Sequence, residues 1–174
     1  MNETRESEAA PMRNRTTIER KADLELVVTR TFNGPVRIVF EAWSRPELFK
    51  RWWAPKSLGI PLLSCEMDVR TGGGYRLEFG EDASKSFAFF GKYIEVIPNA
   101  RIVWTNEEEG DGAVTTVTFE AVTSKEWGDQ TLLTLSERYP TKAARDLAIQ
   151  GSAEGLPEQF EQLDELLVAL ATGA

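Results

Sequence analysis

The stretch that decides the fold is residues 40–55, which read Phe-Glu-Ala-Trp-Ser-Arg-Pro-Glu-Leu-Phe-Lys-Arg-Trp-Trp-Ala-Pro. It holds three of the five tryptophans, Trp43, Trp52 and Trp53, and predicts two short helices separated at Pro46. Aromatic side chains of this size need a wide apolar space. Whether they line a packed core or a cavity decides whether the protein only folds or also holds a ligand.

The composition is that of one ordinary globular domain. The 174 residues are 41% hydrophobic and 28% charged. Residues 1–22 have few large apolar side chains and are predicted to be a disordered tail before a domain at 23–172. The net charge of -8 argues against nucleic acid as a partner. No apolar run approaches the roughly 20 residues of a membrane span, so no membrane insertion is expected. Without a signal-peptide pattern, the cytoplasm is the expected location.

The chain contains no histidine and a single cysteine, Cys65. The missing histidines exclude Ser-His-Asp and Cys-His nucleophilic catalysis. They also remove the commonest metal ligand, and one cysteine cannot form an internal disulfide or a thiolate cluster. Cys65 stands in an apolar alternation and is expected to be a buried, inert thiol. The sequence therefore predicts no metal site, no cofactor and no catalytic residue.

The apolar periodicity predicts an α+β fold. A strand at 24–32 precedes the two short helices, Val36, Val39, Phe40 and Trp43 share one helix face, and the closing segment at 141–170 is an amphipathic helix. Between them, alternating patterns and turn residues predict six strands, at 62–70, 75–79, 87–97, 101–106, 113–122 and 130–139. A meandering antiparallel sheet with one apolar face needs a cover, and only the last helix is long enough. A curved sheet around this helix leaves a cavity between them.

This order resembles the helix-grip fold of the START/Bet v 1-like superfamily. Four motifs make the chain similar to the family named after the C-terminal domain of the activator of Hsp90 ATPase: residues 30–43 (RTFNGPVRIVFEAW), 46–55 (PELFKRWWAP), 68–76 (DVRTGGGYR) and 91–98 (GKYIEVIP). Gly155-Leu156 looks like the family's Gly-Trp, with Leu156 in place of tryptophan. The resemblance covers residues 24–170.

The resemblance implies a non-enzymatic protein that binds a hydrophobic small molecule between the sheet and the long helix. Stand-alone members are mostly thought to act this way, and one related group binds a lipophilic antibiotic. Two alternatives stay open. One is an interaction module for a chaperone or a regulatory protein, supported here only by the acidic composition. The other is a cyclase-like or hydratase-like enzyme using Tyr93, Glu95 or Arg101 as acid or base.

The candidate ligand-binding residues are the large apolar side chains expected on the inner face. Trp43 lies on the apolar face of its helix and is expected to pack inward. The adjacent Trp52 and Trp53 cannot both face inward from one helix, so one of them is expected at the cavity mouth. The full set is Trp43, Trp52, Trp53, Met67, Tyr75, Phe89, Tyr93, Trp104, Phe119, Leu156 and Phe160.

Three further patterns favour ordinary structural roles. Arg70 and Arg76 could hold a ligand carboxylate, but they alternate out of phase with the apolar residues, which favours pairing with Asp68 and Glu78 on a solvated hairpin. The glycines at 72–74 join two strands, which favours a turn over a phosphate site. The acidic run at 107–111 does not have the spacing of an EF-hand, so solvated side chains are expected there.

Overall fold

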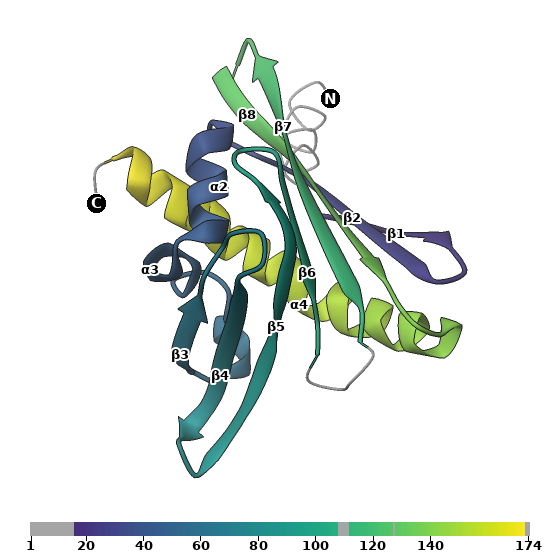
Figure 1. Cartoon of the computed structure of the whole chain (residues 1–174). Coiled ribbons are helices and arrows are strands. Elements are labelled where there is room, and N and C mark those ends of the chain that lie inside the picture. The colour runs from purple at the N-terminus through teal and green to yellow at the C-terminus, as the bar shows by residue number, and fades with distance from the viewer. Residues whose placement is uncertain (1–15, 108–111, 127, 173–174) are drawn as a thin grey trace, which may run out of the picture.

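The computed structural model describes residues 16–107, 112–126 and 128–172 (Figure 1). The strands and helices follow one another as β1 (Thr17–Ala22), β2 (Glu25–Phe32), α2 (Val36–Ser44), α3 (Pro46–Phe49), the 3-10 helix η1 (Lys56–Leu58), β3 (Leu62–Met67), β4 (Gly74–Asp82), β5 (Lys85–Ile97), β6 (Arg101–Thr105), β7 (Val114–Ser124), β8 (Gly128–Arg138) and α4 (Lys142–Ala171).

The strands form one antiparallel sheet in the order β1-β2-β8-β7-β6-β5-β4-β3. Strands β3 to β8 are a meander, each paired with the next in sequence. The last strand, β8, pairs with β2 over the whole length of β2, from Glu25 opposite Arg138 to Phe32 opposite Thr131. The segment with α2 and α3 therefore carries the chain from β2 to β3, which is an edge strand of the sheet.

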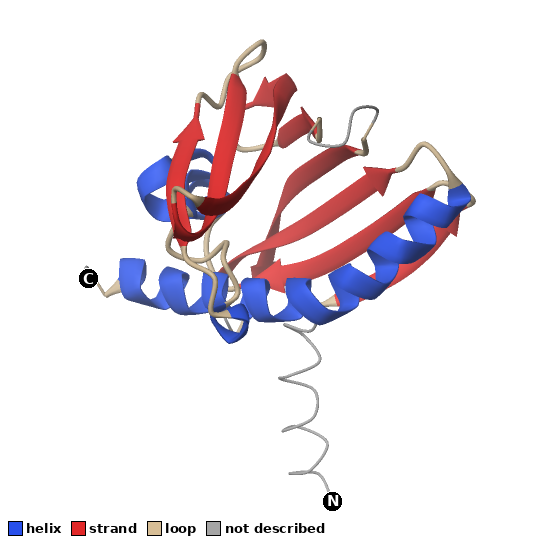
Figure 2. Ribbon diagram, turned by 90° about the horizontal axis from the view of Figure 1, so that it is seen from below, coloured by secondary structure: helices blue, strands red, loops and turns tan. Residues whose placement is uncertain are grey.

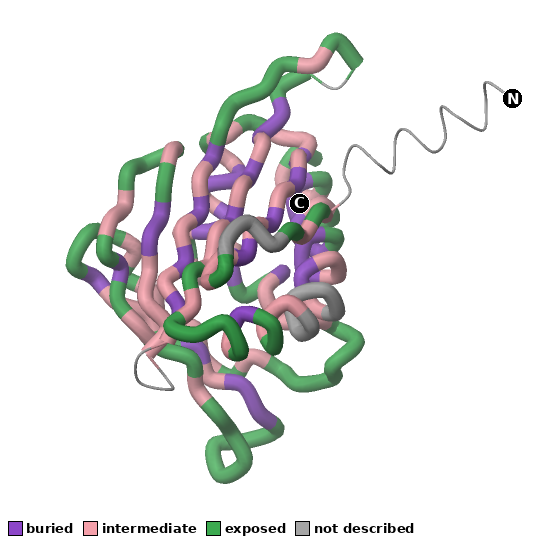
Figure 3. Tube along the Cα trace, turned by 90° about the vertical axis from the view of Figure 1, so that its right-hand side faces the viewer, coloured by how far each residue is buried: buried purple, intermediate pink, exposed green. Residues whose placement is uncertain are grey.

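Helix α4 lies across the concave face of the sheet, as Figure 2 shows. Thr141 caps its N-terminus, where the hydroxyl accepts a hydrogen bond of 3.1 Å from the backbone N–H of Ala144. The side chains of Leu156, Phe160 and Leu163 recur at helical spacing and are buried in the core. Burial is concentrated on the sides of the strands and of α4 that face each other, and the hairpin tips are exposed (Figure 3).

The α+β helix-grip fold and the six-strand meander are confirmed, with two local corrections. The prediction of a disordered tail through residue 22 is wrong for Thr17–Ala22, which form β1 and pair with β2. Backbone pairing at a sheet edge orders this segment although it carries few apolar side chains. The second short helix, which the sequence predicts to continue to about Trp53, ends at Phe49. Residues 1–15 of the predicted tail lie outside the described residues.

Strand β5 changes partner along its length and so bends the sheet. Its first part pairs with β4 as far as Lys92, and from Tyr93 onward it pairs with β6. Gly91 stands at the change, where a side chain would bring its Cβ within 1.9 Å of the Thr105 carbonyl oxygen. Only glycine allows this close approach of two backbones. The bend turns β3, β4 and the first half of β5 into a wall that faces α4.

An apolar cavity between the sheet and the long helix

Trp43 is the centre of the aromatic cluster that the sequence predicted. Its ring lies 4.8 Å from that of Trp52, 5.9 Å from that of Trp53 and 6.1 Å from that of Trp104, measured between centroids. The Trp43 side chain is 2% exposed, which confirms that it packs inward. Its indole N–H is buried and meets no acceptor among the described residues.

Trp52 and Trp53 diverge, as adjacent residues must. Trp52 is fully buried, and its indole N–H donates a hydrogen bond of 2.9 Å to the carbonyl oxygen of Ala42. Trp53 is half-buried and stacks on Phe49 with a centroid separation of 4.8 Å. Trp52 therefore belongs to the core, and only Trp53 of this pair reaches the cavity.

Two glutamines of α4 fix the loop that follows α3. The side-chain amide of Gln162 donates to the carbonyl oxygens of Trp52 and Ala54, at 2.8 and 2.9 Å, and its oxygen accepts from the backbone N–H of Lys56. Gln159 donates to the carbonyl oxygen of Trp53. Both glutamine side chains are buried, so these bonds replace those that the loop backbone would make with water.

A cavity of about 400 Å³ lies between the wall of β3 to β6, the loop around η1 and the middle of α4. This volume is within the range of small-molecule sites. Among the described residues, those that line it carry no charge: Trp43, Phe49, Trp53, Pro55, Leu58, Ile60, Met67, Tyr75, Leu77, Phe79, Phe87, Phe89, Tyr93, Ile102, Trp104, Asn106, Gly155 and Gln159.

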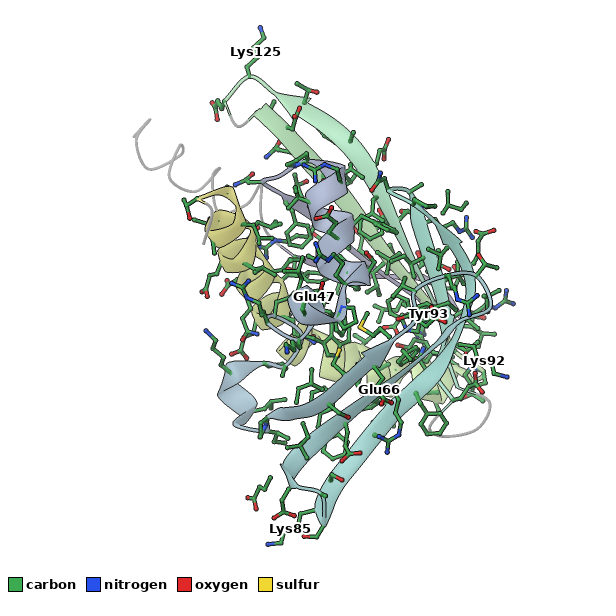
Figure 4. The ribbon with its side chains drawn as sticks, turned by 60° about the vertical axis from the view of Figure 1, so that its left-hand side comes forward. Glu47, Glu66, Lys85, Lys92, Tyr93 and Lys125 are labelled. Carbon is green, nitrogen blue, oxygen red and sulfur yellow. The ribbon has the colours of Figure 1, made fainter. Side chains whose placement is uncertain are left out.

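Seven of the predicted residues line the cavity: Trp43, Trp53, Met67, Tyr75, Phe89, Tyr93 and Trp104. Trp104 stands directly opposite Tyr93 in the β5–β6 register. Figure 4 shows Tyr93 on the side of the sheet that faces α4, whereas Lys92 points away.

Four predicted residues do not line the cavity: Trp52, Phe119, Leu156 and Phe160. All four are buried in the core. Phe119 packs edge-on against Phe40 of α2, and Phe160 packs against Phe32 of β2, with centroids 5.3 and 5.4 Å apart. Both rings face the interior, but Phe40 of α2 packs against Phe119, and Phe32 of β2 packs against Phe160.

The mouth of the cavity lies between the loop around η1 and the β4–β5 hairpin. Leu58 and Ile60 on one side and Phe87 and Phe89 on the other line the cavity and are also exposed, with Leu58 at 62% and Phe87 at 50%. One tryptophan of the Trp52-Trp53 pair was expected at the mouth; Trp53 lines the cavity and is half-buried, whereas Trp52 lies in the core. Sequence analysis did not predict Leu58, Ile60 and Phe87 as cavity residues. The pattern that could have indicated them is an apolar side chain in a polar loop or near a hairpin tip.

The arginines near the glycine turn form ion pairs with acidic residues close by in the sequence. Arg70 bonds Asp68, and Arg76 bonds Glu78 at 2.8 Å, all on the outer surface. Burial raises the pKa of the Cys65 thiol to about 11, which keeps it protonated and unreactive. No group of three potential metal ligands occurs in the part of the chain that the structure describes, and residues 108–111 of the acidic run lie outside it.

Asn106 is a polar cavity residue that sequence analysis also missed. It follows Trp104 by two positions, so the alternation that places Trp104 on the inner face also places Asn106 there. Its side-chain amide donates to the carbonyl oxygen of Ala113 at 2.8 Å and to the hydroxyl of Thr115 at 3.0 Å. The Thr115 hydroxyl in turn donates to the carboxyl of Glu137 at 3.0 Å.

Glu137 ends this chain of hydrogen bonds behind the cavity. Burial raises the pKa of its carboxyl, and the hydrogen bonds from Thr115 and Tyr139 offset the shift in part. The pKa of Tyr139 is also raised, by burial and by the neighbouring Glu137. We call Asn106, Thr115, Glu137 and Tyr139 the polar relay.

Comparison with known families identifies the one to which the chain belongs. The model of the activator of Hsp90 ATPase homolog 1-like protein family matches residues 33–168, and the chain belongs to that family. Its fold is that of a ligand-binding or regulatory module. Comparison with curated proteins gave no match.

Solved structures of bacterial proteins share the fold. A protein from Nitrosomonas europaea is 26% identical, with a TM-score of 0.70 over 88% of this chain and 99% of that one. A protein from Rhodobacter sphaeroides is 24% identical, with a TM-score of 0.75 over 89% and 99%. A family protein from Aeromonas hydrophila is 21% identical, with a TM-score of 0.56 over 84% and 94%. None of the helices described here is long and apolar enough to cross a membrane.

Proposed function

We propose that this protein binds an apolar small molecule in the cavity between the sheet and α4, without chemical conversion. The observation that carries the proposal is a cavity of about 400 Å³ whose described lining is uncharged and mostly aromatic or aliphatic. Such side chains favour an apolar ligand because its transfer from water removes apolar surface from solvent. The exposed Leu58 and Phe87 at the mouth extend the apolar surface to the outside.

The placement of titratable groups favours binding over catalysis. Glu95 and Arg101, which could have served as acid or base, pair with each other at 2.9 Å on the surface. Neither lines the cavity. Tyr93 does line it, but burial raises the pKa of its hydroxyl, so it is a poor base near neutral pH.

A neutral fluorescent probe tests the proposal. N-phenyl-1-naphthylamine brightens in apolar surroundings, and we expect saturable binding to the wild-type protein. Met67→Trp adds bulk on the inner face of β3 and should weaken binding at least tenfold, because the cavity loses volume. Glu66→Trp adds comparable bulk one residue away, on the outer face, where Glu66 is exposed, and should leave affinity within about twofold. Equal affinity of all three proteins, or no binding to any, would exclude the proposal.

A further inference from the structure

The cavity contains few polar groups, and one of them is held in a fixed orientation. The side-chain amide N–H groups of Asn106 are both used, one by the Ala113 carbonyl and one by the Thr115 hydroxyl. An amide group has two such hydrogens and no more. The nitrogen of Asn106 therefore points to β7, and its carbonyl oxygen points to the other side, 3.3 Å from the hydroxyl of Tyr75.

The rest of the polar relay fixes this orientation from behind. Thr115 is 1% exposed, and its hydroxyl accepts from Asn106 and donates to Glu137. A hydroxyl carries one hydrogen, so the direction of each bond in the chain is determined. Turning the Asn106 amide over would place its oxygen against the Ala113 carbonyl, which is repulsive. The relay thus presents a carbonyl oxygen on the cavity side.

The Asn106 oxygen retains capacity to accept a hydrogen bond. The Tyr75 hydroxyl donates to two acceptors, the carbonyl oxygen of Thr105 at 2.7 Å and, over a longer 3.3 Å, the Asn106 oxygen. Asn106 and Tyr75 both line the cavity. A carbonyl oxygen has two lone pairs, so the Asn106 oxygen can accept a second hydrogen bond beside that from Tyr75, and an acceptor with a lone pair left in an apolar site favours a ligand that supplies a donor.

The charge of the lining narrows the ligand class further. No carboxylate, ammonium or guanidinium group is among the described residues that line the cavity. Burying an ionised ligand group without a partner is strongly unfavourable, because the charge loses its hydration and gains nothing in return. A neutral hydroxyl group meets both conditions.

We propose that the Asn106 side-chain oxygen is the recognition point of the cavity and accepts a hydrogen bond from a neutral hydroxyl group on an otherwise apolar ligand, an alcohol or a phenol. Thr115 and Glu137 are positioning residues that hold the amide for this contact. The inference rests on the proposed function, since it names the class of ligand for the same cavity.

Gln159 is the rival acceptor. It also lines the cavity, and because its side-chain nitrogen donates to the Trp53 carbonyl, its oxygen is the part of the amide left to accept from a ligand. The test must therefore separate Asn106 from Gln159.

Calorimetric titration with two matched compounds provides this test. 2-Naphthol carries the hydroxyl donor, and 2-methoxynaphthalene has the same ring system and oxygen without the donor. We expect wild-type protein to bind 2-naphthol about fivefold more tightly, the ratio expected for one neutral hydrogen bond. Asn106→Leu should abolish this preference while it retains affinity for 2-methoxynaphthalene. Gln159→Leu should keep the preference.

A second pair of variants guards against misfolding of Asn106→Leu. Thr115→Val removes the hydroxyl that holds the Asn106 amide and should reduce the preference. Thr116→Val, the same change on the opposite face of β7, should leave it unchanged.

The two proposals fail in different ways. If both compounds bind wild-type protein equally, or if the preference is lost in Gln159→Leu and kept in Asn106→Leu, the assignment of Asn106 is wrong and ligand binding stands. If neither compound nor the fluorescent probe binds, both proposals are wrong.

Discussion

The interior has two regions of similar composition and different packing. In the closed region, which α2 covers, the rings of Trp52, Phe119 and Phe160 are at most 6% exposed and fill the space between helices and sheet. In the open region, along β4 and β5, Phe87 and Phe89 present the same kind of surface to a cavity and are 50% and 39% exposed. Aromatic content therefore does not distinguish a core from a ligand site.

The difference follows from what lies opposite each strand. Helix α2 contacts β7, β8 and α4, so its side chains enter the closed region. The β4–β5 hairpin instead extends beyond the bend at Gly91, and Figure 1 shows that its tip projects past the helices. Side chains of the facing elements fill the space in the closed region, whereas in the open region they only line it. The cavity forms where the sheet extends beyond the helices that pack on its concave face.

Removing an aromatic ring from the closed region should produce the largest effect. Trp52→Ala deletes a fully buried ring and its hydrogen bond to Ala42, and should lower the free energy of unfolding by about 3–5 kcal/mol. Urea denaturation measures the change. A loss below about 1 kcal/mol would mean that the closed region is not a tightly packed core.

The equivalent change in the open region should affect binding more than stability. Phe89 is 39% exposed and contacts Phe79 and Phe87 with centroids 5.7 and 5.6 Å away. Phe89→Ala should lower the free energy of unfolding by about 1 kcal/mol, because only part of its area leaves water on folding. The affinity for N-phenyl-1-naphthylamine should fall severalfold, since Phe89 lines the cavity.

The comparison of Trp52→Ala with Phe89→Ala tests whether the two regions differ in packing. If Phe89→Ala destabilises the protein as much as Trp52→Ala, the wall of β4 and β5 is part of the core. If Phe89→Ala leaves probe affinity unchanged, the probe occupies another part of the molecule.

Periodicity was sufficient for the architecture and for the inner face of each strand. The alternation of β4, β5 and β6 correctly placed Tyr75, Tyr93 and Trp104 toward the cavity, because a strand has a strict two-residue repeat. The same rule predicts that Phe119 faces inward, which is correct. It does not say what stands in front of Phe119, since that depends on α2, which is remote in sequence.

Contacts between distant segments account for the remaining errors. Strand β1 is ordered because it pairs with β2, although its own composition predicts disorder. Trp52 is buried in a loop that Gln162, over one hundred residues away, holds in place. The polar relay joins β6, β7 and β8 through register, which links Trp104 to Thr115 and Thr115 to Glu137. Such pairings are set by the three-dimensional arrangement of the strands.

The smallest predicted effect concerns Glu137, which lies behind the cavity wall. Its folded-state pKa is raised above the ordinary value of 4.5, chiefly by burial. The protonated form is thus favoured on folding, so the stabilisation is complete below pH 4.5 and is lost as the pH rises through the folded-state pKa. The amide introduced by Glu137→Gln cannot titrate, so the free energy of unfolding of this variant should rise relative to wild type as the pH increases from about 4.5 to about 8.

Urea denaturation of both proteins across this range measures the difference directly. Asp164, whose pKa is also raised by burial, titrates in both proteins and cancels in the subtraction. Glu120→Gln makes the same change of charge at an exposed position of β7 and is the matched control. A flat profile for Glu137→Gln would mean that water reaches the carboxyl as freely as it reaches Glu120. The open region would then extend to β8, behind the cavity.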